Sequence, residues 1–269
     1  MQGRLCPPFE GRFQAFPVEG WQMEFSGARE AGLNCIEWIF EKPQEDLNPL
    51  ASDAGIDEIR ALTAKTGVEV QSICADYYMS ELLINPQGAP RPQAIEHLRW
   101  LMTRASKLSV IYIVLPFVDA SSLKTDAQRS GAVRVLKDLA HHAARTGVEL
   151  HLETDLSPVV FNDMLEAIGK PIVRANFDIG NSASLGYDPT EEITTLAPYL
   201  GSVHVKDRIL NGGTVPLGTG NADLATCFRL ILDAGFDRHF VLQAARGENG
   251  KEIELAARNR AFVESHMAK

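Results

Sequence analysis

The chain has 269 residues, of which 45% are hydrophobic and 23% charged, and its 35 acidic side chains outnumber 26 Lys and Arg to give a formal net charge of −9. This size and composition predict one globular domain over residues 1–269 that can bury a full core. The acidic balance argues against a nucleic-acid or membrane surface, because either partner would repel a negative face, although a local basic pocket could still bind a small anion.

Short apolar runs alternate with longer helical patterns along the chain. The expected strands cover residues 2–5, 34–40, 68–74, 110–115, 148–153, 172–178, 201–206 and 239–243. The expected helices cover 19–31, 54–66, 91–107, 124–146, 157–168, 190–197, 223–234 and 251–265, with caps near Asp53, Ser157, Asp188 and Asp223. Eight strands in this alternation predict an α/β fold, a single (βα)8 TIM barrel.

An open doubly wound sheet would show the same alternation. It would normally have fewer strands or a Gly-rich phosphate turn after the first strand, and GRLCPP is not such a turn. We therefore favour the barrel. The long connections 77–92 and 207–222 both follow the ends of expected strands, where lids over a site are commonly found.

Four expected strands end on a side chain that can bind a divalent cation. Glu153 closes VELHLE, Asp178 closes VRANFD, His204 lies in SVHVKD and Gln243 closes HFVLQ. They lie about 25 to 40 residues apart, the spacing of successive βα units, so one ligand from each strand would converge at one end of a parallel sheet. This convergence is the strongest functional signal in the sequence.

The alternation of side chains along each strand supports that convergence. If Glu153 points into the barrel, then His151 and Glu149 do so too. The same rule predicts further inward side chains at Arg174, Asn176, Asp178, His204, Lys206, Val241 and Gln243. So many polar groups need either mutual pairing or a metal ion to offset desolvation. We expect Glu149 to pair with Arg174 in the lower layer, and the upper layer to hold the ion.

The cysteines and the first residues indicate the compartment. Cys6, Cys35, Cys74 and Cys227 are widely spaced and form no CxxC pair, which predicts buried free thiols in a reducing compartment. Residues 1–30 contain charged side chains and no apolar run of signal-peptide length, and no segment approaches 18 apolar residues. We expect a cytoplasmic protein with no membrane partner.

Several segments resemble the sugar phosphate isomerase/epimerase superfamily of xylose isomerase-like TIM barrels, which includes ketose 3-epimerases and endonuclease IV. They are MQGRL, GLNCIEWIF, HLETD, FDIGN, HVKDR and VPLGTGNADLATCFRLILDAGF, and the resemblance spans essentially the whole chain. It implies one divalent metal ion (Mn²⁺, Co²⁺, Zn²⁺ or Mg²⁺) bound by Glu153, Asp178 and His204. Gln243 stands where relatives carry a fourth ligand, a Glu.

This departure at Gln243 affects the expected chemistry. In the 3-epimerases of the family two glutamates flank the substrate, and a glutamine cannot transfer a proton as the second of them. Gln243 can still bind an ion through its amide oxygen, and two ionised ligands would then leave the centre formally neutral and more Lewis acidic. One-base isomerisation with Glu153 as the base is therefore favoured. Epimerisation would need the other proton from His151, Asp155, Glu37 or Asp207.

Further residues are expected to contact the substrate. Lys206 could hold a substrate oxygen or the enediolate, and a structural pairing with Glu153 or Asp178 stays open. Arg208 and Arg246 could bind a phosphate or carboxylate. Glu37 resembles a position that contacts hydroxyl groups in relatives, and Asn181 stands where several relatives carry a substrate-binding His. His151 completes the expected substrate-binding set. Residues 218–221 could form an anion-binding nest or a plain turn, and the sequence leaves both possibilities open.

The sequence thus predicts a metal-dependent isomerase or epimerase that acts on a sugar or sugar phosphate through an enediolate. Two alternatives stay open: a non-catalytic sugar-binding barrel, and a metal-dependent lyase or hydrolase on the same fold. Nucleic-acid cleavage is disfavoured because a three-zinc site needs more ligands than the seven His provide in suitable places. Relatives are often dimers or tetramers, so a homo-oligomer is compatible with the resemblance, but no interface signature is visible.

Overall fold

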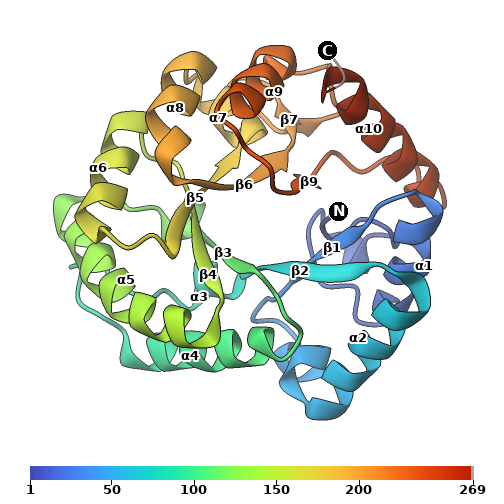
Figure 1. Ribbon diagram of the computed structural model, residues 1–269, viewed down its shortest axis with the longest axis horizontal. Helices are drawn as coiled ribbons and strands as arrows, with labels where there is room; N and C mark the ends of the chain where they lie inside the picture. Colours follow the sequence, from blue (N-terminus) through green and yellow to red (C-terminus); the bar gives the residue numbers. More distant parts are fainter. Residues whose placement is uncertain (268–269) are drawn as a thin grey trace.

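Seven parallel strands form one sheet that curves into an inner ring, with helices around its outside (Figure 1). The computed structural model describes residues 1–267. Around the sheet the order is β1 (Cys35–Ile39), β2 (Glu69–Cys74), β3 (Tyr112–Phe117), β4 (Glu149–Thr154), β5 (Val173–Asp178), β6 (Leu200–Val205) and β9 (Phe240–Leu242). The predicted TIM-barrel fold is confirmed, and all carboxyl ends of the strands lie at one mouth.

The first expected strand, over residues 2–5, is wrong in its length. Gln2 forms a single parallel bridge with Glu37, and its backbone N–H donates to the Leu242 carbonyl at 3.2 Å, so this one residue joins β1 to β9. Gly3 then has a φ of 49°, and a Cβ there would lie 2.3 Å from Ile39 Cδ1. Glycine favours the turn of the chain away from the sheet here, because a side chain would be strained at this φ and would displace Ile39.

Eight longer helices lie around the sheet and correspond to the eight expected ones (Figure 1). They are α1 (Trp21–Glu30), α2 (Asp53–Thr66), α4 (Pro92–Ser106), α5 (Asp126–Thr146), α6 (Pro158–Ile168), α8 (Pro189–Leu196), α9 (Leu224–Asp233) and α10 (Glu252–Met267). Asp188 and Asp223 accept backbone N–H groups as expected, whereas Ser52, not Asp53, caps α2. In the described part of the chain, no helix combines the length and the apolarity that a membrane crossing requires.

Additional short elements lie in the loops after the strands. The connection 77–92 contains α3 (Tyr77–Ser80), and α7 (Ile179–Leu185) follows β5 directly. The connection 207–222 contains an antiparallel hairpin of β7 (Asp207–Arg208) and β8 (Thr214–Val215). Short 3-10 turns lie at Phe9–Gly11, Glu45–Leu47, Pro49–Ala51, Asp119–Ser121 and Ala197–Tyr199. These elements build the mouth of the barrel.

The core divides into an apolar outer layer and a polar interior. Leu150, Leu152, Phe177, Val203 and Val205 are buried between the strands and the helices. The buried interior side chains are instead largely polar: Glu37, Ser72, His151, Asn176, Ser202 and His204. The predicted alternation is therefore confirmed. Cys74, Tyr112 and Val114 form a small apolar cluster of their own, separate from the main core.

Candidate metal centre and active site

Three of the four expected ligands meet at the carboxyl end of the sheet. Glu153, Asp178 and His204 come from β4, β5 and β6, and one ligand atom from each lies within 4.8 Å of the others. All three side chains are buried. The strand register explains the meeting, because Asp178 pairs directly with His204 across β5 and β6. Two carboxylates and an imidazole at this spacing suit a divalent cation such as Mn²⁺ or Zn²⁺.

Gln243 supplies the observation that tests whether a cation fits. It follows β9, is 2% exposed and lines the same pocket as Glu153. Its Oε1 atom is buried and has no hydrogen-bond partner among the described residues. A buried amide oxygen without a partner is costly unless another group binds it. A cation held by Glu153, Asp178 and His204 would satisfy this oxygen, so the residues present fit the metal.

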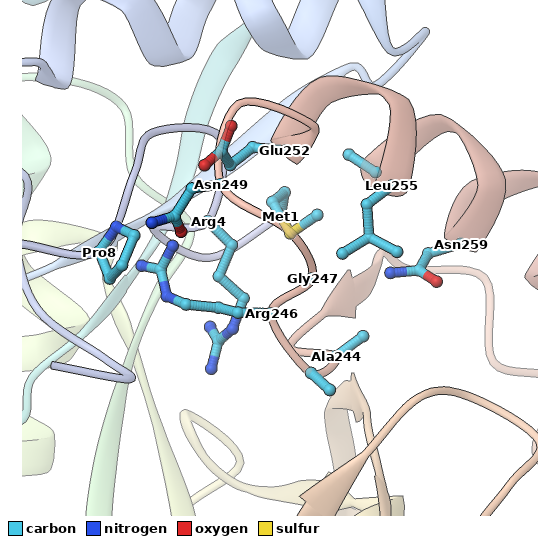
Figure 2. A pocket seen from close by; sticks show the side chains of 12 residues that line it. Met1, Arg4, Pro8, Ala244, Arg246, Gly247, Asn249, Glu252, Leu255 and Asn259 are labelled. Carbon is cyan, nitrogen blue, oxygen red and sulfur yellow. The ribbon is translucent and has the colours of Figure 1, made fainter. Parts of the chain in front are cut away.

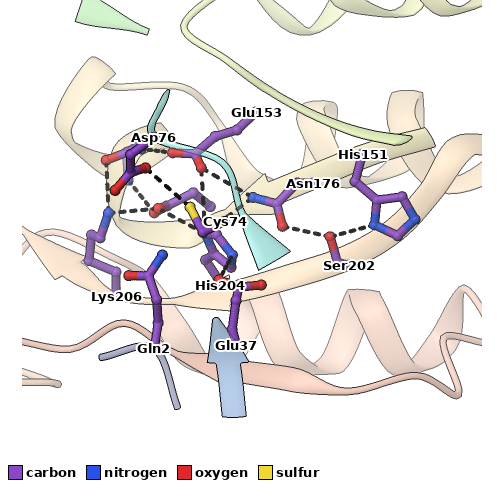
Figure 3. A network of polar contacts seen from close by, with 12 residues as sticks. Gln2, Glu37, Cys74, Asp76, His151, Glu153, Asn176, Ser202, His204 and Lys206 are labelled. Carbon is purple, nitrogen blue, oxygen red and sulfur yellow. Dashed lines mark hydrogen bonds and ion pairs between the residues drawn. The ribbon is translucent and has the colours of Figure 1, made fainter. Parts of the chain in front are cut away.

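Glu37 lies against the imidazole of His204 at ion-pair distance (Figure 3). His204 Nε2 lies 2.9 Å from Glu37 Oε1, and the Ser72 hydroxyl donates to Glu37 Oε2 at 2.8 Å. On the other side of the ring, the Nδ1 atom lies 3.5 Å from Glu153 Oε2 and 3.8 Å from Asp178 Oδ2. A carboxylate behind a ligating histidine is the usual device that holds its tautomer and ring orientation.

The charges in this cluster call for a cation. Burial would lower the pKa of His204, but Glu37, Asp178 and Glu153 raise it well above its ordinary value. Burial opposes the ionisation of Asp178, but Lys206 and His204 outweigh it and hold the pKa of this carboxyl below its usual range. Three carboxylates thus surround one lysine and one histidine. A divalent cation with a neutral His204 would balance them.

A chain of hydrogen bonds leads from these residues to the pocket. Lys206 Nζ donates to Asp178 Oδ2 at 2.8 Å. Of the two carboxylates with which Lys206 could pair, Asp178 is therefore the partner. Asn181 Nδ2 donates to Glu153 Oε1 at 2.6 Å. Arg208 Nη1 donates in turn to Asn181 Oδ1 at 2.9 Å. Asn181 therefore holds one oxygen of Glu153 in position, and Arg208 holds Asn181.

A pocket of about 460 Å³ opens above the cluster, between the loops at the carboxyl ends of the strands. It is large enough for a monosaccharide. Five residues expected at the site line it: Glu153, Asn181, Lys206, Arg208 and Gln243. Further lining comes from the N-terminal segment and the loops after β1 to β3, including Arg12, Gln14, Glu41, Lys42, Asp76 and Asp119.

Two expected substrate-binding residues lie beneath the pocket instead of in it. Glu37 is 1% exposed and binds His204, as described. His151 is fully buried in the lower layer, where Nδ1 lies 2.8 Å from Ser202 Oγ and Nε2 lies 2.8 Å from Glu149 Oε2. Burial lowers the pKa of His151 to about 4. The expected ion pair between Glu149 and Arg174 is present at 3.5 Å.

Arg246, the third such residue, does not line this pocket and lies beside Arg4 and Pro8 of the N-terminal segment (Figure 2). Its Nε, Nη1 and Nη2 atoms donate to the carbonyls of Phe13, Cys6 and Gly3 at 2.8, 2.9 and 2.8 Å. The hollow beside it has a volume of only about 10 Å³, enough for a water molecule and too small for a sugar phosphate. The structure therefore places Arg246 as an anchor for residues 3–13.

The possible second proton donors are also held outside the pocket. Asp155 accepts a hydrogen bond from the Ser122 hydroxyl at 2.8 Å and is absent from the lining. Asp207 is fully buried and accepts backbone N–H groups of Gly218, Gly220 and Ala222 at 2.9, 2.8 and 3.1 Å. The segment 218–221 thus does form an anion-binding turn, and the protein's own Asp207 carboxylate fills it.

Asp76 and Gln14 are pocket residues that sequence reasoning missed. Asp76 follows β2 by two residues, and Gln14 Nε2 donates to its Oδ2 at 2.6 Å. Asp76 could have been predicted from the sequence, because a carboxylate near the end of an expected strand is the same kind of signal that identified Asp178. Gln14 lies in an irregular segment whose path no periodicity indicates, so the sequence contained no comparable signal for it.

Comparison with known proteins agrees with this architecture. Residues 25–266 match the family model described as "Xylose isomerase-like TIM barrel". The chain is 26% identical to the L-ribulose-5-phosphate 3-epimerase of Salmonella heidelberg strain SL476, over 95% of this chain and 93% of that protein.

Solved structures show the same fold. D-psicose 3-epimerase with D-tagatose from Clostridium cellulolyticum H10 has a TM-score of 0.74 at 16% identity, over 96% of both chains. A xylose isomerase-like TIM barrel protein from Mycobacterium smegmatis in complex with magnesium has a TM-score of 0.71 at 20% identity, over 98% of this chain and 93% of that one.

Proposed function

This chain belongs to the xylose isomerase-like TIM barrel family, and from that premise we propose that it is a metal-dependent sugar isomerase or epimerase that moves a proton on the carbon beside a carbonyl group. The observation that carries the proposal is the buried set of Glu153, Asp178 and His204 below a sugar-sized pocket, which Gln243, with its unpartnered oxygen, also lines. A relative of similar length is named as an L-ribulose-5-phosphate 3-epimerase, which supports a ketose or its phosphate as substrate.

Glu153 is the proposed base. Its Oε1 is fixed by Asn181 Nδ2 at 2.6 Å, while the side chain borders the pocket at 5% exposure, so one carboxylate is both oriented and accessible to substrate. Removing a proton beside the carbonyl leaves an enediolate, whose negative charge needs stabilisation. A divalent cation held by Glu153, Asp178, His204 and Gln243 would supply Lewis acidity toward the carbonyl.

Lys206 and Arg208 are the proposed binders of substrate oxygens. Lys206 is 8% exposed and lines the pocket beside Asp178, so its ammonium can shift between this carboxylate and an enediolate oxygen. Arg208 lies at the rim, where a guanidinium suits a phosphate or a carboxylate. Both cations line the same pocket as Glu153, so they favour a substrate that carries or develops negative charge there.

Solvent exchange tests this function directly. The protein, stripped of metal by a chelator and reloaded with Mn²⁺, is incubated in deuterated water with 2-ketopentoses and 2-ketohexoses, each free and as the terminal phosphate. We expect deuterium at C1 or C3 of at least one ketose, loss of exchange without Mn²⁺, and loss in Glu153→Gln. Carbohydrate binding without exchange in any ketose would contradict an isomerase and indicate a binding protein.

A further inference from the structure

We propose that Asp76, which lines the pocket from the loop after β2 while Glu153 lines it from β4, is a second proton-transfer residue, and that the reaction inverts the carbon beside the carbonyl. The proposal rests on the proposed function and deepens it from a choice between isomerase and epimerase to epimerase. Asp76 would also supply the second proton donor that epimerisation needs, which Gln243 cannot be because its amide does not transfer a proton.

The pocket leaves few acidic side chains for a second role. Besides Glu153, its lining contains Glu41, Asp76 and Asp119. Glu41 is held by Arg12 at 2.7 Å and by the Phe16 backbone N–H at 2.8 Å, so both its oxygens are engaged by strong donors. Asp119 lies in an exposed 3-10 turn at the rim. Asp76 is less exposed than Asp119, and unlike Glu41 it has no cationic partner within 4 Å among the described residues. It is partly buried and lines the pocket.

The hydrogen bonds of Asp76 come from neutral groups. Gln14 Nε2 donates to Oδ2 at 2.6 Å, and the Cys74 thiol donates to Oδ1 at 3.3 Å. Gln14 Oε1 accepts in turn from Arg4 Nη2 at 3.3 Å, which fixes the amide so that its NH₂ group points at Asp76. These contacts orient the carboxyl without locking it in an ion pair, as a group that must both give and accept a proton requires.

Asp76 also does not perform the structural task of its position. It stands at the N-cap of α3, where an aspartate normally accepts a backbone N–H of the first helical turn. Its side chain makes no such hydrogen bond and is directed instead toward Cys74 and Gln14. Figure 3 shows it near Glu153 and Lys206. An aspartate that leaves its cap unused and lines the pocket has a placement that helix stability does not explain.

The electrostatic surroundings of Asp76 agree with proton exchange near neutral pH. Burial raises its pKa to about 6, with Glu153 and Glu41 adding to the rise and the bonds from Gln14 and Cys74 opposing it. The buried cation Arg4 contacts Asp76 only through Gln14. Cys74 remains a neutral thiol, because burial and Asp76 raise its own pKa well above the ordinary value.

The proposed steps balance. Glu153 takes the proton from the carbon beside the carbonyl, and the electrons of that C–H bond form the enediolate. Protonated Asp76 then gives its proton to the same carbon from another side, which restores the carbonyl with inverted configuration. One C–H bond breaks and one forms, with no oxidation or reduction. The two carboxyl groups exchange their protonation states and are reset by solvent.

The experiment compares the wild type with Asp76→Asn, using Asp119→Asn as a matched control on the same rim. Each Mn²⁺-loaded protein is incubated with the same ketose panel in deuterated water, and NMR measures both exchange and the amount of epimer. We expect the wild type and Asp119→Asn to form an epimer deuterated at the inverted carbon. Asp76→Asn should retain exchange in the starting ketose while epimer formation falls at least about 100-fold.

The outcomes separate the two proposals. Exchange without inversion in the wild type, or inversion at the wild-type rate in Asp76→Asn, would overturn the role of Asp76 and leave an isomerase. No exchange in the wild type would overturn the function and the role of Asp76 with it. If Asp76→Asn binds no Mn²⁺ or unfolds, Asp76→Glu replaces it: the retained carboxyl should give partial inversion, and its complete absence with intact exchange would contradict the proposal.

Discussion

Glu37 and His204 form an ion pair at 2.9 Å with no exposed side-chain surface on either residue, directly beneath the candidate metal ligands. We expect Glu37→Gln to weaken Mn²⁺ binding about 10- to 100-fold, because the imidazole loses the carboxylate that orients it. Isothermal titration calorimetry measures the affinity. Ser72→Ala, which removes only the hydroxyl behind Glu37, should have a smaller effect. Unchanged Mn²⁺ affinity with a raised KM would favour direct substrate contact by Glu37.

Gln243→Glu tests the fourth ligand. A carboxylate in place of the unpartnered Oε1 adds a negative charge beside the cation, so the affinity for Mn²⁺ should rise by about tenfold, while Gln243→Leu should lower it. Calorimetric titration of both variants at one pH provides the comparison. Equal affinities in the wild type and both variants would mean that Gln243 does not bind the metal.

Stability should depend on pH through Glu24, a buried carboxyl bound by the Leu5 backbone N–H at 3.2 Å. Burial raises its pKa from 4.5 to about 7, so between these values the folded protein retains a proton that the unfolded chain has released. Its contribution to stability is therefore present at low pH and is lost as pH rises through this window.

Glu24→Gln should remove that dependence. Relative to the wild type, the variant should gain about 3 kcal/mol in its free energy of unfolding between pH 4.5 and pH 8. Urea denaturation at both pH values measures the difference, with the exposed Glu30→Gln as the matched control. The same stability difference at both pH values would show that folding leaves the pKa of Glu24 unchanged.

Asp207→Ala should loosen the loop 207–222. Three backbone N–H groups lose the carboxylate that binds them, which should cost about 3 kcal/mol of unfolding free energy. Because Arg208 and Thr214 of this loop line the pocket, KM should rise more than kcat falls. Denaturation and steady-state kinetics measure these effects. As a control, the exposed Asp233→Ala variant should change neither stability nor kinetics. If the loop of Asp207→Ala exchanged its amide hydrogens at the wild-type rate, Asp207 would not be what holds the loop in place.

The inner ring and the ligand cluster could be predicted because both follow from periodicity. Strand parity alone placed Glu153, Asp178 and His204 on one face, and the βα spacing put them at one mouth. The same rule correctly paired Glu149 with Arg174, although it missed Arg238, whose bidentate bonds to Glu149 at 2.5 and 3.1 Å are shorter. Arg238 lies before β9 in an irregular connection, where parity does not apply.

Residues on loops could not be assigned from the sequence, since their direction depends on tertiary contacts. Arg208 and Arg246 looked equivalent as cations just past strand ends. The hairpin turns Arg208 toward Asn181, whereas the carbonyls of Gly3, Cys6 and Phe13 draw Arg246 to the N-terminal segment. Likewise, depth along the strand, not parity, decides that His151 stays beneath the pocket while Glu153, two residues later, reaches it.

The junction between Gln2 and Leu242 has a consequence for biosynthesis. A ribosome must deliver residue 242 before residue 2 can meet it, and the anchor between Gly3 and Arg246 needs a few residues more. Contacts of such long range form late in folding. The leading segment that carries the pocket residue Gln14 therefore gains these anchors only after residue 246 has been made, and the part of the pocket that it lines is secured late.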